Sequence, residues 1–483
     1  MTTDDDLDGD VPEDLGENVE GVSPDVEASV ETDEATITDD SELERTLGLT
    51  GGLAIGVGTM IGAGIFVFPG LAGAEVGTAA TASFAVGGVI ALLVALPTSE
   101  LATAMPKSGG GYYFISRGLG TLAGTVVGLS LWLGLVFATS FYLVGLGFYL
   151  LDFFAAAGVQ VTASPGTLVS GIAVVSGAGF TLLNVTGTEN AAKLQNAIVA
   201  LLLSMLVAFL GFGLLDAFGF VDASASAGTE ADRWAALPVL STAALVFTSY
   251  LGFAQVATVA GEMKDPGRNL PLAMIGSVVL VTVLYVLTIF VATNVFDRER
   301  LGEAGETAMV EVGRELLGSG GALVIVVGGL LATMSSANAS ILSTSRAIYG
   351  VSKDALLPEE ASRINLRYGT PHVALGMAGG PVVVLAATRQ VALLAEVASF
   401  LHLVMYGLIC VALLAIRRDE PDWYEPEFRV PGGPVVPALG AAASFGLIGF
   451  MDRVSQLIGL CVMAATAGWY YYYAGDVRLR GAT

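Results

Sequence analysis

Backbone groups, rather than reactive side chains, are the best candidates for chemistry in this sequence. They lie in the uncharged segment 48–73, which is long enough to cross a bilayer and is rich in glycine. Glycines at 58, 62 and 64 weaken a helix in mid-membrane, where lipid offers the backbone no hydrogen-bond partner. An interruption there leaves N–H and C=O groups free to bind a polar ligand. The segment therefore predicts a ligand site.

A second interruption is predicted within 245–262, where Thr248, Ser249, Gly252 and Gln255 break an apolar run. Transporters built from inverted repeats place their site where two discontinuous helices meet. The two segments fall in the first and sixth predicted spans, which are equivalent positions if ten helices form two halves of five. A packing face of small residues is the alternative for the glycines, but it leaves the second interruption unexplained.

The elements that must position these groups are transmembrane helices. Of the 483 residues, 54% are hydrophobic and 14% are charged, against roughly 25% charged in soluble domains. No Ser/His or His/Asp/Glu constellation recurs in the spans, so an enzyme is disfavoured, and nothing indicates a nucleic-acid partner. The sequence predicts an all-α integral membrane protein in a lipid bilayer. Its twelve expected spans are 48–74, 79–105, 119–151, 165–186, 192–219, 237–261, 270–296, 319–350, 371–388, 391–416, 434–450 and 454–474.

The net charge of -24 is concentrated at the N-terminus. Residues 1–44 hold 18 acidic residues and no Lys or Arg, which leaves 27 acidic and 21 basic residues for the rest. This segment also lacks the basic start and apolar core of a signal peptide. We expect 1–44 to be a disordered, acidic, cytoplasmic tail.

Basic residues predict the orientation. With the N-terminus inside, 15 of the 21 Lys and Arg fall in cytoplasmic segments and 6 in external ones. Both termini are therefore expected in the cytoplasm, in a multi-pass protein of the cytoplasmic membrane. Residues 297–318 mix charged and apolar types and could form a short external helix, with packing or gating as alternative roles.

Five segments, in order along the chain, resemble the amino acid–polyamine–organocation (APC) permeases. The similarity runs from about residue 47 to the C-terminus and leaves only the acidic tail outside. The five segments are Gly58-Thr-Met-Ile-Gly-Ala-Gly-Ile-Phe66; Glu100-Leu-Ala-Thr-Ala-Met-Pro106 with Gly109-Gly-Gly-Tyr-Tyr113; Ser249-Tyr-Leu-Gly-Phe253 with Gly261-Glu-Met-Lys-Asp-Pro266 and Asn269-Leu-Pro271; Ser345-Arg-Ala-Ile-Tyr349 with Lys353, Asp354, Leu357 and Pro358; and Arg429-Val-Pro431-Gly.

The resemblance implies a sodium-leucine-transporter-like 5+5 inverted repeat with broken helices 1 and 6. The domain would span 45–483, with core repeats at 48–219 and 237–416 and peripheral helices at 434–474. It also implies a secondary transporter that moves an amino acid by alternating access. An amino acid/polyamine exchanger and a membrane sensor that binds an amino acid without moving it are the alternatives.

The same resemblance implies the site residues, most of them through their main chain. Glycines at 62, 64 and 252 would let the ligand approach the backbone closely, and Phe253 would form a wall or gate, with core packing as the alternative. Amides expected to face the substrate carboxylate are those of Ile61, Gly62, Ala63 and Gly64. Carbonyls expected to accept from the substrate ammonium are those near Thr59, Thr248, Ser249 and Leu251.

The coupling ion, sodium or a proton, stays open. Some proton-coupled relatives carry a lysine in the fifth helix, where this sequence aligns Leu202. Ser335, Ser336 and Asn338 could supply oxygen ligands to sodium, although hydrogen bonding between helices is the favoured alternative. No other cofactor is expected. Glu396 and His402 are intramembrane ionisable groups that could handle protons or serve only structure.

The residues after Gly252 favour a neutral substrate. They are Phe253, Ala254 and Gln255, whereas a cationic substrate would favour an acidic side chain there. Three charged residues near predicted helix ends are expected to form structural or gating ion pairs: Glu100, Glu262 and Arg346. Which amino acid is moved, whether by symport or exchange, and in what oligomeric state all stay open.

Overall fold

The structure is a computed structural model in which residues 45, 47–106, 110–159, 164–186, 191–221, 223, 234–365, 368 and 370–477 are described. For residues 191–196 the description covers the backbone alone. The tail predicted over 1–44 lies outside the described residues.

The described part of the chain is built from helices, with only isolated bridges outside them, one of which joins Leu47 to Met263. Helices are expected because a bilayer cannot satisfy backbone groups and each helix satisfies its own. The α-helices are α2 (Leu49–Met60), α3 (Gly64–Val76), α4 (Ala80–Ala104), α5 (Gly110–Leu119), α6 (Thr121–Ala156), α7 (Pro165–Thr186), α8 (Ala191–Ala217), α9 (Ala236–Val246), α10 (Gln255–Thr258), α11 (Pro266–Val295), α12 (Arg298–Ala304), α13 (Ala308–Lys353), α14 (His372–Ala386), α15 (Val391–Asp419), α16 (Val435–Ile448) and α17 (Arg453–Trp469). Short 3-10 turns are η1 (Gly77–Ala79), η2 (Phe247–Ala254), η3 (Ala260–Glu262), η4 (Gly305–Thr307) and η5 (Glu359–Ser362), and α17 continues into a π-turn, η6 (Tyr470–Ala474).

Eight helical stretches in the described residues are long and apolar enough to cross a membrane, or nine if α16 and α17 count as one span bent by 117°. This is fewer than the twelve predicted spans. The difference has identifiable causes: α3 and α4 run on as one stretch of 41 residues, and α14 is short, with 15 residues. α2, with 12 residues, is also too short to cross alone because the predicted first span is broken.

The first break separates α2 from α3. α2 ends at Met60, and Ile61 leaves the helical region with a ψ of 87°. The N–H of Gly62 then donates to the carbonyl of Met60 over 2.9 Å, which forms a tight turn. α3 starts at Gly64, so the interruption falls inside the glycine-rich segment.

The second break lies between α9 and α10. η2 is a 3-10 helix of eight residues. Runs of this geometry longer than three or four residues are uncommon and often mark a hinge. The interruption covers Thr248, Ser249 and Gly252, which is the polar part of the predicted sixth span.

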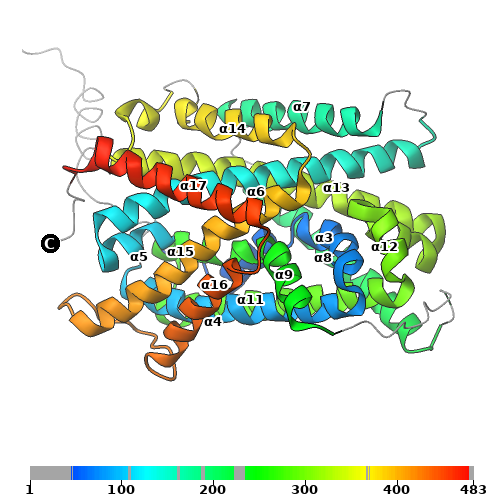
Figure 1. Ribbon diagram of the computed structural model, residues 1–483, viewed down its shortest axis with the longest axis horizontal. Coiled ribbons are helices and arrows are strands. Elements are labelled where there is room, and N and C mark those ends of the chain that lie inside the picture. The colour runs from blue at the N-terminus through cyan, green and yellow to red at the C-terminus, as the bar shows by residue number, and fades with distance from the viewer. Residues whose placement is uncertain are drawn as a thin grey trace, which may run out of the picture. The chain divides into compact units, whose positions relative to one another are not determined.

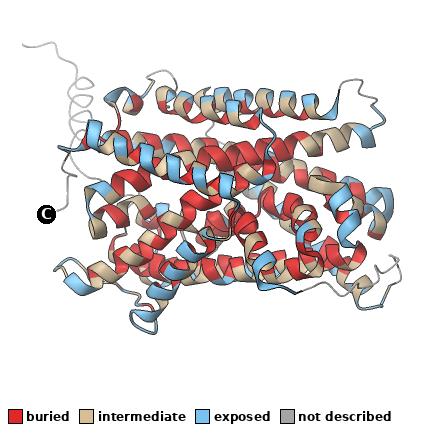
Figure 2. Cartoon of the chain, in the orientation of Figure 1, coloured by how far each residue is buried: buried red, intermediate tan, exposed pale blue. Residues whose placement is uncertain are grey.

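Central and peripheral helices differ in burial. The apolar window of α15 is 72% buried, whereas that of α7 is 17% buried. In Figure 1 the long helices α6 and α13 run side by side, α4 and α11 pair below them, and α7 lies beside α14 at the top. Figure 2 shows the buried residues concentrated on the inner helices. The outer faces of the peripheral helices are apolar and exposed, as expected for surfaces that contact lipid.

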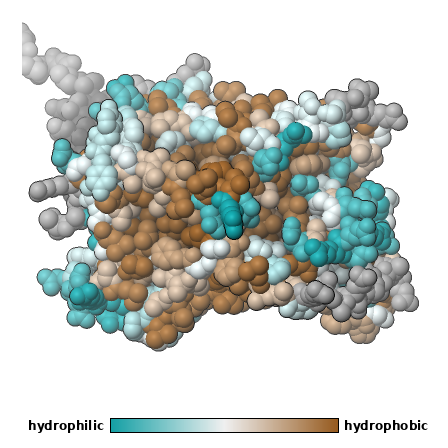
Figure 3. Space-filling model, viewed as in Figure 1, coloured by the Kyte–Doolittle hydropathy of each residue, from teal (hydrophilic) through white to brown (hydrophobic). Residues whose placement is uncertain are grey.

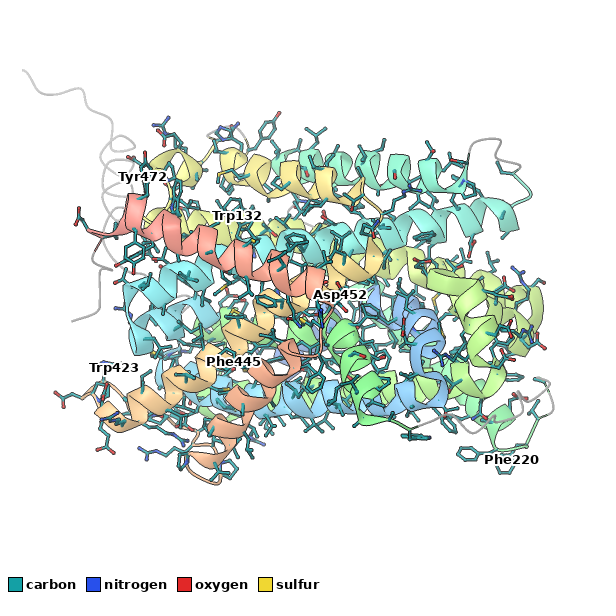
Figure 4. All side chains as sticks on the ribbon, in the orientation of Figure 1. Trp132, Phe220, Trp423, Phe445, Asp452 and Tyr472 are labelled. Carbon is teal, nitrogen blue, oxygen red and sulfur yellow. The ribbon has the colours of Figure 1, made fainter. Side chains whose placement is uncertain are left out.

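α16 and α17 cover α15 from outside. Phe445 of α16 packs against Gly407 of α15, where an added Cβ would lie 2.6 Å from the phenyl ring (Figure 4). Asp452 caps α17 by accepting from the N–H of Val454 over 2.8 Å. Apolar side chains occupy most of the middle of this face of the molecule, and hydrophilic side chains gather mainly toward its ends (Figure 3).

The predicted short helix at 297–318 forms as α12, η4 and the first turns of α13, which is kinked at Gly318 with a φ of 66°. It packs on the end of α3. The guanidinium Nε of Arg298 donates to the carbonyl of Ala74 over 2.6 Å, and the buried Leu301 contacts Gly73. Residues 297–318 therefore pack against α3, and a role of this segment in gating stays a prediction.

Candidate functional site

The two breaks meet through their main chains. The hydroxyl oxygen of Thr59 lies 2.9 Å from the carbonyl oxygen of Gly252 and 2.7 Å from that of Ile55 in its own helix, and its single proton is shared between these acceptors. A Cβ added to Gly252 would lie 2.5 Å from the carbonyl carbon of Thr59 and 2.6 Å from the amide nitrogen of Met60. Backbone atoms cannot rotate away from such a contact, so only glycine permits it. Segments 193 residues apart are thereby joined at one point.

The start of α3 presents hydrogen-bond donors to this point. Among the described residues, no group outside α3 accepts from the N–H of Gly64 or Ile65. These amides are the positive end of the helix dipole. The hydroxyl of Ser249 lies against Gly64, its residue is 5% exposed, and the hydroxyl has no hydrogen-bond partner in the described part of the chain. Together with the two amides it forms a set of donors that suits a carboxylate.

Two buried tyrosines satisfy carbonyls that the breaks release. The hydroxyl of Tyr285, on α11, donates to the carbonyl of Met60 over 2.6 Å and lies 3.2 Å from the carbonyl oxygen of Ser249. The hydroxyl of Tyr406, on α15, donates to the carbonyl of Leu251 over 2.9 Å. Neither tyrosine is among the residues predicted from sequence. The available signal is that a tyrosine buried in an apolar span needs a partner for its hydroxyl.

We expect Tyr285→Phe to lower uptake about tenfold, because it removes the hydroxyl that bonds the Met60 carbonyl and lies beside the Ser249 carbonyl, and a lost buried hydrogen bond costs roughly 1 kcal/mol. Uptake into proteoliposomes measures the effect. Tyr149→Phe is the matched control, since its hydroxyl is equally buried but donates to Phe66 within α3, over 2.8 Å. Equal losses in the two variants would contradict a specific role at the breaks.

Two further residues predicted for the site, Thr248 and Phe253, contact α15. The hydroxyl of Thr248 points to α15, where it donates to the carbonyl of Ala395 over 2.5 Å and lies 2.6 Å from the hydroxyl of Ser399. Phe253 is fully buried, and its ring centroid lies 5.0 Å from that of Tyr406. Both residues therefore hold the second break against α15.

A cavity of about 50 Å³ adjoins both breaks. It is bounded by α2, α6, the second break, α13 and α15, and no Lys, Arg, Asp or Glu lines it. Its lining residues are Gly58, Thr59, Leu135, Ala138, Tyr142, Leu251, Gly252, Gln255, Ser336, Ala339, Ser340, Ser343 and His402.

The predicted sodium ligands on α13 lie in different settings. Ser336 lies against the first break, where a Cβ on Gly62 would overlap its hydroxyl. Ser335 is buried. Asn338 points to α7 instead, because its Oδ1 accepts from Asn184 over 2.8 Å.

The α8 side of the first break is apolar. Val199 faces Gly58, where an added Cβ would lie 2.9 Å from its methyl carbon. Leu202, which aligns with the lysine of proton-coupled relatives, is buried near Gly328 of α13. Neither position supplies a cation beside the break.

One of the three charged residues predicted at helix ends forms a buried cluster. Glu100, 0% exposed, pairs with Arg417 and accepts from the hydroxyl of Tyr424 and from the N–H of Val430, the last over 2.6 Å. Burial, and then the bond to Glu100, raises the pKa of the Tyr424 phenol. The cluster ties the loop after α15 to α4. Trp423, in the same loop, points outward (Figure 4).

The other ionisable residues singled out in the sequence are Glu262, Arg346, Glu396 and His402. In the described part of the chain, the side chains of Glu262 and Arg346 form no ion pair. Glu396 accepts from the N–H of Asp452 over 3.2 Å. His402 lines the cavity, and its Nδ1 lies 2.8 Å from the carbonyl oxygen of Ala398.

Residues 47–470 match the family model described as amino acid permease. The chain is 29% identical to the branched-chain amino acid permease BcaP of Bacillus subtilis over 89% of this chain and 93% of that protein. It is 26% identical to the methylthioribose transporter of the same organism, over 89% and 94% of the two chains. It is 25% identical to the serine/threonine exchanger SteT of that organism, over 91% and 99%.

Proposed function

The chain belongs to the amino acid permease family, a family of membrane transporters rather than enzymes, and we propose that it moves a neutral amino acid across the cytoplasmic membrane by alternating access. The observation that carries the proposal is the meeting of two broken helices at Thr59 and Gly252, beside the unpaired amides of α3. The uncharged lining of the adjoining cavity supports a neutral substrate.

In this proposal the substrate binds by its common main-chain atoms. Its carboxylate accepts hydrogen bonds from the α3 amides at Gly64 and from the hydroxyl of Ser249. Its ammonium group donates to carbonyls near Thr59 and Ser249, and its side chain enters the cavity. The amide of Ala63 completes the proposed carboxylate site, whereas the N–H groups of Ile61 and Gly62 donate to the carbonyls of Val57 and Met60, over 2.8 and 2.9 Å. The positive end of the α3 dipole favours the carboxylate at that place.

We also propose the finer membrane arrangement. α2 with α3, and α9 with η2 and α10, each form one broken span, while α4, α6, α7, α8, α11, α13, α14, α15, α16 and α17 supply ten more. The first ten of these twelve form a 5+5 inverted repeat. Both termini lie in the cytoplasm, which the 15-to-6 distribution of basic residues supports.

Uptake of labelled amino acids into proteoliposomes tests the proposal. Sodium and proton gradients are imposed separately, so the coupling ion and any contribution of Ser335 and Ser336 to a sodium site become measurable. Preloading the vesicles with unlabelled amino acid distinguishes an exchanger. Uptake of at least one neutral amino acid is expected, and binding with no flux under any gradient would favour a sensor.

We expect deletion of residues 2–44 to leave the initial rate of uptake within about twofold of the full chain, because every residue of the proposed site lies beyond residue 57. The rate is measured per inserted molecule. A loss of flux with retained ligand binding would assign the acidic segment a role in transport.

A further inference from the structure

His402 holds an open hydrogen-bond acceptor in the cavity beside the breaks. The residue is 3% exposed, and its Nδ1 lies 2.8 Å from the carbonyl oxygen of Ala398. A carbonyl can only accept, so Nδ1 carries the proton and Nε2 is left with a lone pair. Nε2 has no hydrogen-bond partner within the described part of the chain.

Other uncharged polar groups line the same cavity. The amide of Gln255 and the hydroxyls of Ser336, Ser340 and Ser343 form no hydrogen bonds with other described residues. Gln255 is the first residue of α10, and the three serines lie on one face of α13. Leu135 and Ala138 of α6 supply the apolar part of the wall. The cavity thus offers hydrogen bonds without charge, next to a small apolar surface.

We propose that the transported amino acid has a side chain with a hydrogen-bond donor, as in threonine, serine, asparagine or glutamine, and that His402 Nε2 accepts from it. The inference rests on the proposed function, because it assigns the cavity to the substrate's side chain. The cavity is lined by Thr59 and Gly252, the residues at which the two broken helices meet.

Threonine and valine are the decisive pair because they have the same shape and differ by one hydroxyl. A site that hydrogen-bonds a substrate hydroxyl rejects the analogue lacking it, since the buried acceptor is then left unpaired. An apolar pocket does not strongly reject an added hydroxyl. We expect the full chain to favour threonine over valine by roughly tenfold or more in kcat/KM.

The test measures initial uptake of both amino acids by the wild type and three variants in proteoliposomes. His402→Leu removes the acceptor and should bring the ratio near one. His402→Gln keeps an acceptor oxygen and should preserve most of the preference. His372→Leu is the matched control, because His372 is exposed at the start of α14, and it should leave the ratio unchanged.

Each outcome bears on the inference. A wild-type ratio at or below one, or a ratio that His402→Leu leaves unchanged, overturns it while uptake itself still supports a permease. Absence of uptake for every amino acid overturns the proposed function instead. If His402→Leu fails to insert, Ser340→Ala measures the same cavity, and the wild-type ratio alone still decides for or against a polar substrate.

Discussion

Gly252→Ala is expected to lower uptake by about 100-fold while the protein still inserts. The added methyl group would lie 2.5 Å from the carbonyl carbon of Thr59, and the opposing atoms belong to the backbone of α2. The two breaks must therefore separate, which also weakens the bond between Thr59 and the carbonyl of Gly252. Displacements of about 1 Å in a reacting or binding centre cost roughly 100-fold.

Gly171→Ala on α7 is the control for this variant, because an added Cβ there meets nothing within 4 Å. Gly62→Ala should be milder than Gly252→Ala, since the methyl group meets the Ser336 side chain, which can rotate. Gly62→Leu should abolish uptake. Normal transport by Gly252→Ala or by Gly62→Leu would disprove a site formed by the two breaks.

The second large effect is expected for stability rather than transport. Glu100→Gln should destabilise the fold by about 1–3 kcal/mol, because it removes a buried acceptor from donors that stay in place, while Arg417 itself is partly exposed. Four donors from three residues converge on the carboxylate: two nitrogens of Arg417, the hydroxyl of Tyr424 and the N–H of Val430. An amide cannot accept from all of them. Thermal unfolding of the purified protein in detergent measures the loss.

Glu311→Gln provides the comparison for Glu100→Gln. It removes an exposed ion pair with Arg314, three residues along the same helix and 3.1 Å away. Such surface pairs contribute about 0–1 kcal/mol. If both variants unfold at the same temperature, the buried cluster does not hold the loop after α15. KM of the folded fraction should be unchanged in both.

Local features of the sequence predict much of the fold. The glycines at 58, 62 and 64 place the first interruption, and the polar residues from Thr248 to Gly252 place the second. Both depend on short-range effects, because glycine and hydroxyl residues disturb a helix wherever they occur in it. The family membership is confirmed, and the all-helical membrane character agrees with the eight or nine membrane-length helices.

The sequence does not predict contacts between residues that are distant in the chain. No local pattern indicates that Thr248 turns to Ser399, that Asn338 pairs with Asn184, or that Glu100 binds Arg417 317 residues away. Hydropathy alone cannot show that only the three-residue turn η1 separates α3 from α4, or that α14 is short. Tertiary packing decides these features, and hydropathy does not record it.

The bond from Tyr285 to Met60 has a consequence for biosynthesis. The carbonyl of Met60 has one local donor, the N–H of Gly62, and obtains its second donor from a residue synthesised 225 positions later. Until α11 enters the bilayer, the turn at the first break is held by its local hydrogen bond without the contact from Tyr285. The first span must therefore wait for the seventh before this contact fixes its break. Nascent chains that end before α11 should accordingly be prone to misassembly and rapid degradation.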